Sequence, residues 1–362
     1  MNTIPIFDGH NDTVHKIHEF CGPDSDPAGI DFLAANTSNH LDLPRARAGG
    51  LFGGFFALWV PAEHPQQDAL TATETSYAVR LAEPLDPAYA RRSIATQLAA
   101  LKSLATRSNG QIRITTTADA IEQARIDGTF AILLHMEGAE AIGPNLAELD
   151  TLYAQGLRSL GPVWSRPNIF GYGVPFAFPS SPDTGLGLTP LGFDLIRDCN
   201  RLGVLIDLSH LNEQGFWDVA RTSTAPLVAT HTAVHALCPS ARNLTDRQLD
   251  AIRDSNGIVG LNLCVNDLRP DAHRNSDTDL ATVVRHITYL VDRLGIDCVA
   301  LGSDFDGATI PTAIGDASGL PNLIAALRTH GFDDVSLHKL ARENWLRILR
   351  LTLKNYPPHS GA

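Results

Sequence analysis

The stretch Val204-Leu205-Ile206-Asp207-Leu208-Ser209-His210 is an apolar run that ends in a histidine, and Pro226-Leu227-Val228-Ala229-Thr230-His231 ends in the same way. Short apolar runs bounded by glycine and polar residues are typical of buried strands, and the residues between the two runs have helical periodicity. If the strands are parallel neighbours, both imidazoles reach one C-terminal sheet edge, where α/β folds place their chemistry. Because neutral imidazole is the commonest metal-binding side chain, this edge is a candidate metal site.

Other apolar runs end in residues of the same kind. Near the N-terminus, His10 and Asp12 are two positions apart and therefore share one face of a strand. A central run ends in Glu137, a carboxylate that is costly there unless a cation compensates its charge. A run near the C-terminus ends in Asp304, with Asp306 on the same face as a competing candidate.

Strand-like and helical segments alternate along the whole chain. Strands are predicted at about 4–9, 51–60, 130–137, 159–164, 204–209, 226–230, 257–263 and 298–304. Helices are predicted at about 68–108, 145–155, 190–202, 212–222, 245–255, 278–294, 320–330 and 336–353. This alternation indicates parallel pairing, so we expect an α/β fold of the (β/α)8 TIM-barrel type. Long insertions follow the second strand (61–129) and the fourth (165–190), and the latter is expected to fold over the barrel mouth.

Composition narrows the class of protein. The 362 residues are 44% hydrophobic and 19% charged, and no linker-like segment divides them, so one domain over residues 1–362 is expected. A formal charge of -12 argues against nucleic acid or an anionic membrane as a partner. The first strand begins almost at Met1 and no long apolar stretch occurs, which predicts a soluble, cytoplasmic protein. The five cysteines are scattered, so neither disulfides nor a thiolate metal site is expected.

On the predicted barrel, the metal-binding residue types gather at C-terminal strand ends: His10, Asp12, Glu137, His210, His231 and Asp304. Histidines and carboxylates in this combination suit zinc or a similar borderline divalent ion. Six groups are more than one tetrahedral zinc uses. We therefore expect two metals that share a carboxylate, about 3.5–4 Å apart, with a hydroxide between them.

With these residues in place, the sequence resembles the membrane (renal-type) dipeptidases, which are binuclear zinc peptidases with the (β/α)8 fold, related to the amidohydrolases. The resemblance covers nearly the whole chain. It rests on motifs in the same order: Asp-Gly-His-Asn-Asp (8–12), Glu-Gly-Ala-Glu-Ala-Ile (137–142), Ile-Asp-Leu-Ser-His (206–210), Thr-His (230–231) with Ala-Arg-Asn-Leu (241–244), and Gly-Ser-Asp-Phe-Asp-Gly (302–307).

The resemblance implies a role for each residue. It implies two Zn²⁺ ions per chain, with His10 and Asp12 on one, His210 and His231 on the other, Glu137 bridging them, Asp304 as the proton shuttle and Arg242 holding the substrate's terminal carboxylate. The implied substrate is a dipeptide, with a D-residue accepted in second place. The bridging hydroxide would attack the peptide carbonyl. The oligomeric state is not fixed, and a homodimer is left open.

One position departs from the family pattern. Where the family's fourth strand ends in Thr-His, this chain has Trp164. We predict that Trp164 lines the pocket beneath the Pro- and Phe-rich loop that follows it, and the alternative is a tryptophan packed in the core. His135 and Asp8 are interpreted as core or orienting residues. Two other functions stay open: a different amidohydrolase-type reaction, such as deacylation or lactam opening, and a catalytically silent metal-binding barrel.

Overall fold

The computed structural model describes residues 4–21, 31–63 and 70–354. Every predicted strand range overlaps a strand of the structure: β1 (Ile6–Asn11), β2 (Leu51–Trp59), β6 (Phe130–Glu137), β7 (Leu157–Gly161), β9 (Leu205–Ile206), β10 (Val228–Thr232), β11 (Ile258–Leu261) and β12 (Val299–Leu301). The strands that the sequence did not predict are short: β3 (Leu70–Ala72), β4 (Tyr77–Val79), β5 (Ile112–Ile114) and β8 (Ala177–Phe178).

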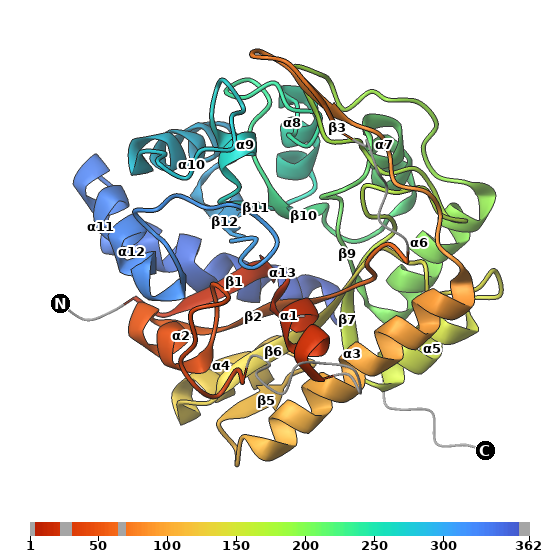
Figure 1. Ribbon diagram of the computed structural model, residues 1–362, viewed down its shortest axis with the longest axis horizontal. Coiled ribbons are helices and arrows are strands. Elements are labelled where there is room, and N and C mark those ends of the chain that lie inside the picture. The colour runs from red at the N-terminus through yellow and green to blue at the C-terminus, as the bar shows by residue number, and fades with distance from the viewer. Residues whose placement is uncertain (1–3, 22–30, 64–69, 355–362) are drawn as a thin grey trace.

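The predicted strands form a curled parallel sheet that helices surround (Figure 1). Hydrogen bonds link them in the orders β1-β2-β6-β7-β9, with β5 beside β6, and β10-β11-β12. Isolated parallel bridges lie at both junctions between the two groups. Asp207 pairs with Val228 at one junction, and Asn11 pairs with Phe305 at the other.

Most of the predicted helices are confirmed with small shifts of their ends: α5 (Ala147–Ala154), α6 (Pro190–Leu202), α7 (Glu213–Thr222), α8 (Asp246–Asp254), α10 (Leu280–Leu294) and α11 (Leu320–His330). The last predicted helix is divided into α12 (Asp334–His338), the π-helical segment η3 (Lys339–Glu343) and α13 (Asn344–Thr352). Unpredicted helices are α1 (Thr13–Cys21), α2 (Leu43–Gly49), α4 (Ala118–Asp127), α9 (Val265–Leu268) and the 3₁₀ turns η1 (Ile296–Cys298) and η2 (Ala317–Gly319).

The predicted helix over residues 68–108 is wrong in its first half. Helix α3 (Pro87–Arg107) begins after Asp86, whose side chain accepts a hydrogen bond from the Tyr89 N–H. Proline has no N–H to donate and cannot continue a helix from the residues before it, but it is favoured at the first helical position, so the helix begins there. The described residues before it form β3 and β4 instead, because they pair with a distant segment.

That pairing builds a small antiparallel sheet, β3-β4-β8, which we call the roof sheet. Tyr77 of β4 lies opposite Phe178 of β8, so the roof sheet joins the two insertions. The Ala241 N–H donates to the Ala177 carbonyl at 3.0 Å, and this bond ties the roof sheet to the residue before Arg242.

Tight packing supports the site from the other side. The indole of Trp345, on α13, is fully buried and donates to the Leu301 carbonyl at 2.9 Å. A Cβ atom at Gly9 would lie 2.3 Å from the Trp345 ring, so only glycine lets β1 approach this closely. The residue before His10 is thereby fixed against the core.

Two sequence expectations concern cysteines and membranes. Cys199, Cys238, Cys264 and Cys298 are free thiols, and the side chain of Cys21 lies outside what the structure describes. Within the ranges that the structure describes, no helix combines the length and the apolar character needed to cross a bilayer.

Candidate active site

The carboxylate of Glu137, at the end of β6, is the meeting point of three imidazoles. Its Oε1 lies 2.9 Å from Nε2 of His210, 3.4 Å from Nε2 of His231 and 3.7 Å from Nε2 of His10. The two nitrogens of His210 and His231 are 3.1 Å apart. All four side chains are buried. Residues from four different strand ends therefore converge on one point, as the sequence predicted.

Asp12 and Asp304 extend this cluster on the side of His10. The three residues offer ligand atoms that all lie within 4.8 Å of one another, and so do His10, Glu137 and His231. Among the described residues, both ring nitrogens of His10 and the Oδ1 atom of Asp12 are buried and find no hydrogen-bond partner. Buried ligand atoms that converge without partners fit a divalent cation, because the cation would satisfy them together.

Hydroxyl groups hold the outer nitrogens of the other two histidines. Ser165 Oγ lies 2.9 Å from His210 Nδ1, and Thr230 Oγ1 lies 2.9 Å from His231 Nδ1. Such contacts orient metal-binding imidazoles and leave Nε2 facing the ion. Both Nε2 atoms here face Glu137.

The electrostatics divide the cluster into two halves. Burial raises the pKa of Glu137 well above its usual value, and the Asp12 carboxylate adds to this effect. Burial and Asp12 likewise raise the pKa of Asp304, to about 8. Burial lowers the pKa of His10, but the Glu137 and Asp12 carboxylates outweigh it and raise the value to about 10. This half gathers three carboxylates around one imidazole, and divalent cations would offset that excess of negative charge.

The two histidines of the other half have pKa values shifted in the opposite direction from that of His10. Burial lowers the pKa values of His210 and His231 well below the usual one, and the positive charges of Arg242 and His10 contribute to this. Both imidazoles are therefore neutral and have a lone pair to offer. Neutral imidazole is the form that binds metals.

Asp304 and Asp306 have different surroundings. The Asp306 carboxylate accepts hydrogen bonds from the Thr13 hydroxyl at 2.7 Å and from the His40 N–H at 2.5 Å. Asp304 instead belongs to the group with His10 and Asp12. Both residues have positive φ angles, 59° at Asp304 and 70° at Asp306. The geometry thus places Asp304, rather than Asp306, beside the candidate metal-binding residues.

Asp8 and His135 lie behind the cluster, as the sequence suggested. Asp8 accepts from the N–H and the hydroxyl of Ser303, both at 2.7 Å, and so orients the residue before Asp304. His135 is fully buried, and its Nδ1 lies 2.9 Å from the Ser159 hydroxyl.

Arg242 is buried beside the two neutral histidines. Its guanidinium donates to the carbonyl oxygens of Ser209 and His231, the latter at 3.4 Å. Arginine has five N–H donors, so these bonds leave others for a ligand. Arg242 also lines the cavity in front of the cluster. The position suits both a carboxylate-binding and a structural role.

Trp164 lines the same cavity. Its ring centroid lies 5.2 Å from that of Trp59, 5.7 Å from that of Phe176 and 5.9 Å from that of His210. On another side, the Arg166 guanidinium carbon lies 5.1 Å from the Trp164 ring centroid. The tryptophan is thus at the boundary between the histidines and the loop that follows β7.

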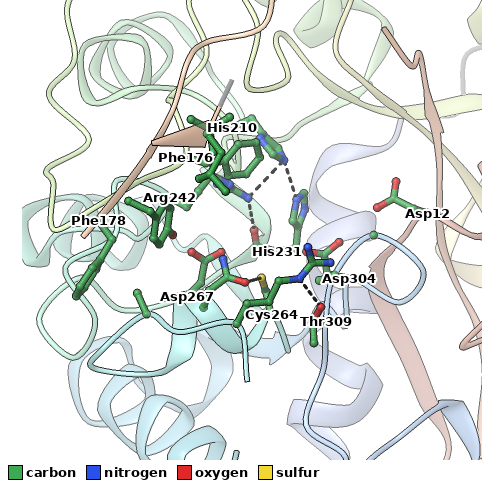
Figure 2. Close-up of a pocket in the computed structure, with 18 of the residues that line it drawn as sticks. Asp12, Phe176, Phe178, His210, His231, Arg242, Cys264, Asp267, Asp304 and Thr309 are labelled. Carbon is green, nitrogen blue, oxygen red and sulfur yellow. Dashed lines mark hydrogen bonds between the residues drawn. The ribbon is translucent and has the colours of Figure 1, made fainter. Parts of the chain in front are cut away.

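The cavity has a volume of about 690 Å³ and opens in front of the strand ends. Figure 2 shows Asp12 at one end of it and Phe178 at the other. The roof sheet contributes Phe178, which belongs to the loop expected to cover the pocket, and Tyr77, which sequence reasoning did not connect with the site. Asp267 and Cys264 also line the cavity and were missed. Both residues follow β11 but belong to no recognised motif, so little in the sequence marks them as residues of the site.

Comparisons with known proteins agree with this geometry. The family model described as membrane dipeptidase (peptidase family M19) matches residues 1–357. The chain belongs to the membrane dipeptidase family. A crystal structure of a metallopeptidase from Rhodobacter sphaeroides, bound to a phosphinate mimic of the dipeptide L-Ala-D-Ala, is 46% identical. The match covers 97% of this chain and 100% of that one, with a TM-score of 0.92.

Two further relatives extend the comparison. The structure of the metallopeptidase dipeptidase AC, of family M19, is 46% identical with a TM-score of 0.91, covering 97% of this chain and 99% of that one. An uncharacterised protein from the pqqA 5′ region of Klebsiella pneumoniae is 53% identical over 70% of this chain and 94% of the relative. This membrane dipeptidase family member is therefore a metallopeptidase, which argues against a catalytically silent barrel.

Proposed function

We propose that the chain is a zinc-dependent dipeptidase with two Zn²⁺ ions bound at the strand-end cluster. The proposed metal ligands are His10 and Asp12 for one ion, His210 and His231 for the other, and Glu137 for both. The observation that carries this proposal is the approach of three imidazole Nε2 atoms to Glu137 Oε1 at 2.9, 3.4 and 3.7 Å. One carboxylate oxygen within reach of ligands from both halves suits a bridging role.

The proposed architecture is a single (β/α)8 domain over residues 1–362, with long insertions after the second and fourth barrel strands. The parallel bridges Asp207–Val228 and Asn11–Phe305 support closure of the barrel, since they lie where the two sheets meet. The cytoplasmic location stays a prediction. Whether the protein forms a homodimer stays open.

The bound ions would polarise the peptide carbonyl and lower the pKa of an attacking water. The chain's own residues would do the rest. Asp304 would accept the proton that the attacking water loses and pass it to the leaving amine. Arg242 would bind the terminal carboxylate through N–H groups that its two carbonyl contacts leave available. Trp164 would close the pocket over the substrate.

We propose a dipeptide of the L-Xaa-D-Xaa type as the preferred substrate. The relative from Rhodobacter sphaeroides binds a mimic of L-Ala-D-Ala, and it is 46% identical over nearly the whole chain. The cavity of about 690 Å³ has room for side chains larger than alanine, and the aromatic rings of Phe176 and Phe178 line it.

Turnover of L,L- and L,D-dipeptide libraries by the zinc-loaded protein, together with metal analysis, tests the proposal. We expect two zinc equivalents per chain and faster hydrolysis of the L,D series. C-terminally amidated dipeptides serve as the control, since a site that needs a free carboxylate should reject them. Hydrolysis of amidated and free substrates at equal rates would favour the other amidohydrolase-type reactions.

A further inference from the structure

A buried hydrogen-bond network lies behind His210 and His231, with Asp207 at its centre. Asp207 Oδ1 accepts from the N–H and hydroxyl of Ser209, at 3.1 and 2.6 Å, and from the Thr230 N–H at 2.8 Å. Asp207 Oδ2 accepts from the Thr230 hydroxyl at 2.6 Å. Ser209 precedes His210 and Thr230 precedes His231. One carboxylate therefore holds both segments that carry the neutral histidines.

The number of available protons fixes the direction of the next hydrogen bond. A hydroxyl has one proton to donate, and an ionised carboxylate can only accept. The Ser209 hydroxyl donates its proton to Asp207, and the Thr230 hydroxyl does the same from the other side. Thr230 Oγ1 also lies 2.9 Å from His231 Nδ1, and it has no second proton for that contact. His231 Nδ1 must therefore carry the proton and donate it.

We infer that Thr230, oriented by Asp207, is a positioning residue that holds His231 in its Nδ1–H tautomer. This tautomer leaves the lone pair on Nε2, which faces Glu137 at 3.4 Å. The opposite tautomer would point an N–H at the same place and exclude a cation. The inference deepens the proposed function. Its consequence, metal binding at His231 Nε2, rests on that proposed function, whereas the tautomer itself does not.

No other contact of Asp207 takes the place of Thr230. Asp207 Oδ2 lies 4.0 Å from His231 Nδ1, which is too long for a direct hydrogen bond. His135 Nε2 is 3.6 Å from the same oxygen and belongs to a different strand. Among the described residues, the carboxylate thus reaches the His231 ring only through the Thr230 hydroxyl, whereas the Ser209 hydroxyl links it to the His231 backbone N–H, from which it accepts at 3.0 Å. Removing that hydroxyl leaves Nδ1 without an acceptor in a buried site.

The test compares three full-length variants for Zn²⁺ affinity, measured by competition with a chromophoric chelator. Thr230→Val removes the hydroxyl at nearly constant volume, and Thr230→Ser restores it. Thr115→Val is the matched control, because Thr115 is also buried and donates to the Ile132 carbonyl at 3.0 Å, away from the cluster. Loss of an outer hydrogen-bond partner typically lowers metal affinity by about 10–100-fold. We expect that loss for one of the two zinc equivalents in Thr230→Val only, with Thr230→Ser close to wild type.

A second measurement reads the tautomer directly. Nitrogen-15 NMR of the imidazoles in zinc-free wild-type protein should show His231 protonated at Nδ1, and the signal is assigned by its absence in His231→Gln. Thr230→Val should shift the population towards Nε2–H. Protonation at Nε2 in the wild type, or equal zinc affinity in all variants, would overturn the inference. If the wild type bound no zinc, the proposed centre would fail, and the NMR result would still decide the role of Thr230.

Discussion

The strand-end cluster around Glu137 is buried and held from behind by hydrogen bonds, whereas the roof sheet opposite it is largely in solvent. His10 and His231 are at most 1% exposed. All three residues of β3 are exposed, and β4 is at best half-buried. Elements with few buried contacts open most readily. The difference suggests that the cluster carries the chemistry, which needs fixed geometry, and that the roof sheet adjusts to the substrate.

The largest effect should follow from a change at the centre of the buried cluster. Glu137→Gln keeps the shape but removes the charge that is proposed to hold two cations. We expect fewer than two zinc ions per chain and loss of activity, measured by elemental analysis and dipeptide turnover. Two bound zinc ions with wild-type turnover would contradict the bridging role of Glu137. The contrast between a catalytic cluster and an adjustable roof sheet would then lose its basis.

Asp304→Asn should separate chemistry from metal binding within the same cluster. The amide cannot pass on a proton, so kcat should fall by roughly 10²–10⁴-fold, the usual scale of general acid–base catalysis. Zinc content should stay at the wild-type level. An unchanged kcat would move the proton shuttle to another group, and Asp306→Asn is the matched comparison.

Arg242 lies between the two regions, and its replacement should have a smaller effect that depends on the substrate. Arg242→Ala should lower kcat/KM for free dipeptides by roughly 10²-fold, since truncating one partner of a buried charge pair costs about 2–5 kcal/mol. Slow hydrolysis of amidated dipeptides should not change. Equal losses on both substrates would mean that Arg242 acts through its bonds to the Ser209 and His231 carbonyls.

Trp164 tests the boundary where the cluster meets the roof. Trp164→Phe removes the indole N–H, and loss of one donor to a developing oxyanion costs up to about 10²–10³-fold in rate. The substrate preference of Trp164→Phe should stay that of the wild type. Trp164→His should keep both metals and shift the preference towards bulkier residues. Wild-type kinetics in both variants, with only Tm changed, would make Trp164 a packing residue.

The smallest effect is expected at the outer tip of the roof sheet. His273 Nε2 lies 3.0 Å from the Glu74 carbonyl oxygen and links the β3–β4 turn to the body. His273→Ala removes a contact worth about 1 kcal/mol. Hydrogen exchange of residues 70–79 should speed up by a few fold while zinc content stays constant. A change in kcat as large as that of Asp304→Asn would contradict the division between the regions.

The sequence predicted the buried part of the molecule far better than the exposed part. Apolar runs such as 204–209 and 226–230 mark strands through their own composition, so β9 and β10 could be located locally. The pairing of Tyr77 with Phe178 joins distant segments, and no local pattern reports it. The first half of the predicted helix over 68–108 failed for that reason, whereas its second half is α3.

The site shows the same limit. His10, Glu137 and His231 were recognised because residue types that bind metals end apolar runs, but the network behind them was not. A signal existed, since Asp207 and Thr230 are polar residues inside buried strand-like segments. Their hydrogen bonds depend on side-chain directions across neighbouring strands, which a sequence does not specify.

The left-handed backbone at Asp304 has a consequence for how this protein can change over time. A non-glycine residue with φ of 59° costs roughly 1–2 kcal/mol, which glycine would not. A population of variants selected only for thermal stability would therefore tend to accept glycine at this position and lose the proposed proton shuttle. The aspartate marks a place where the requirements of folding and of catalysis oppose each other.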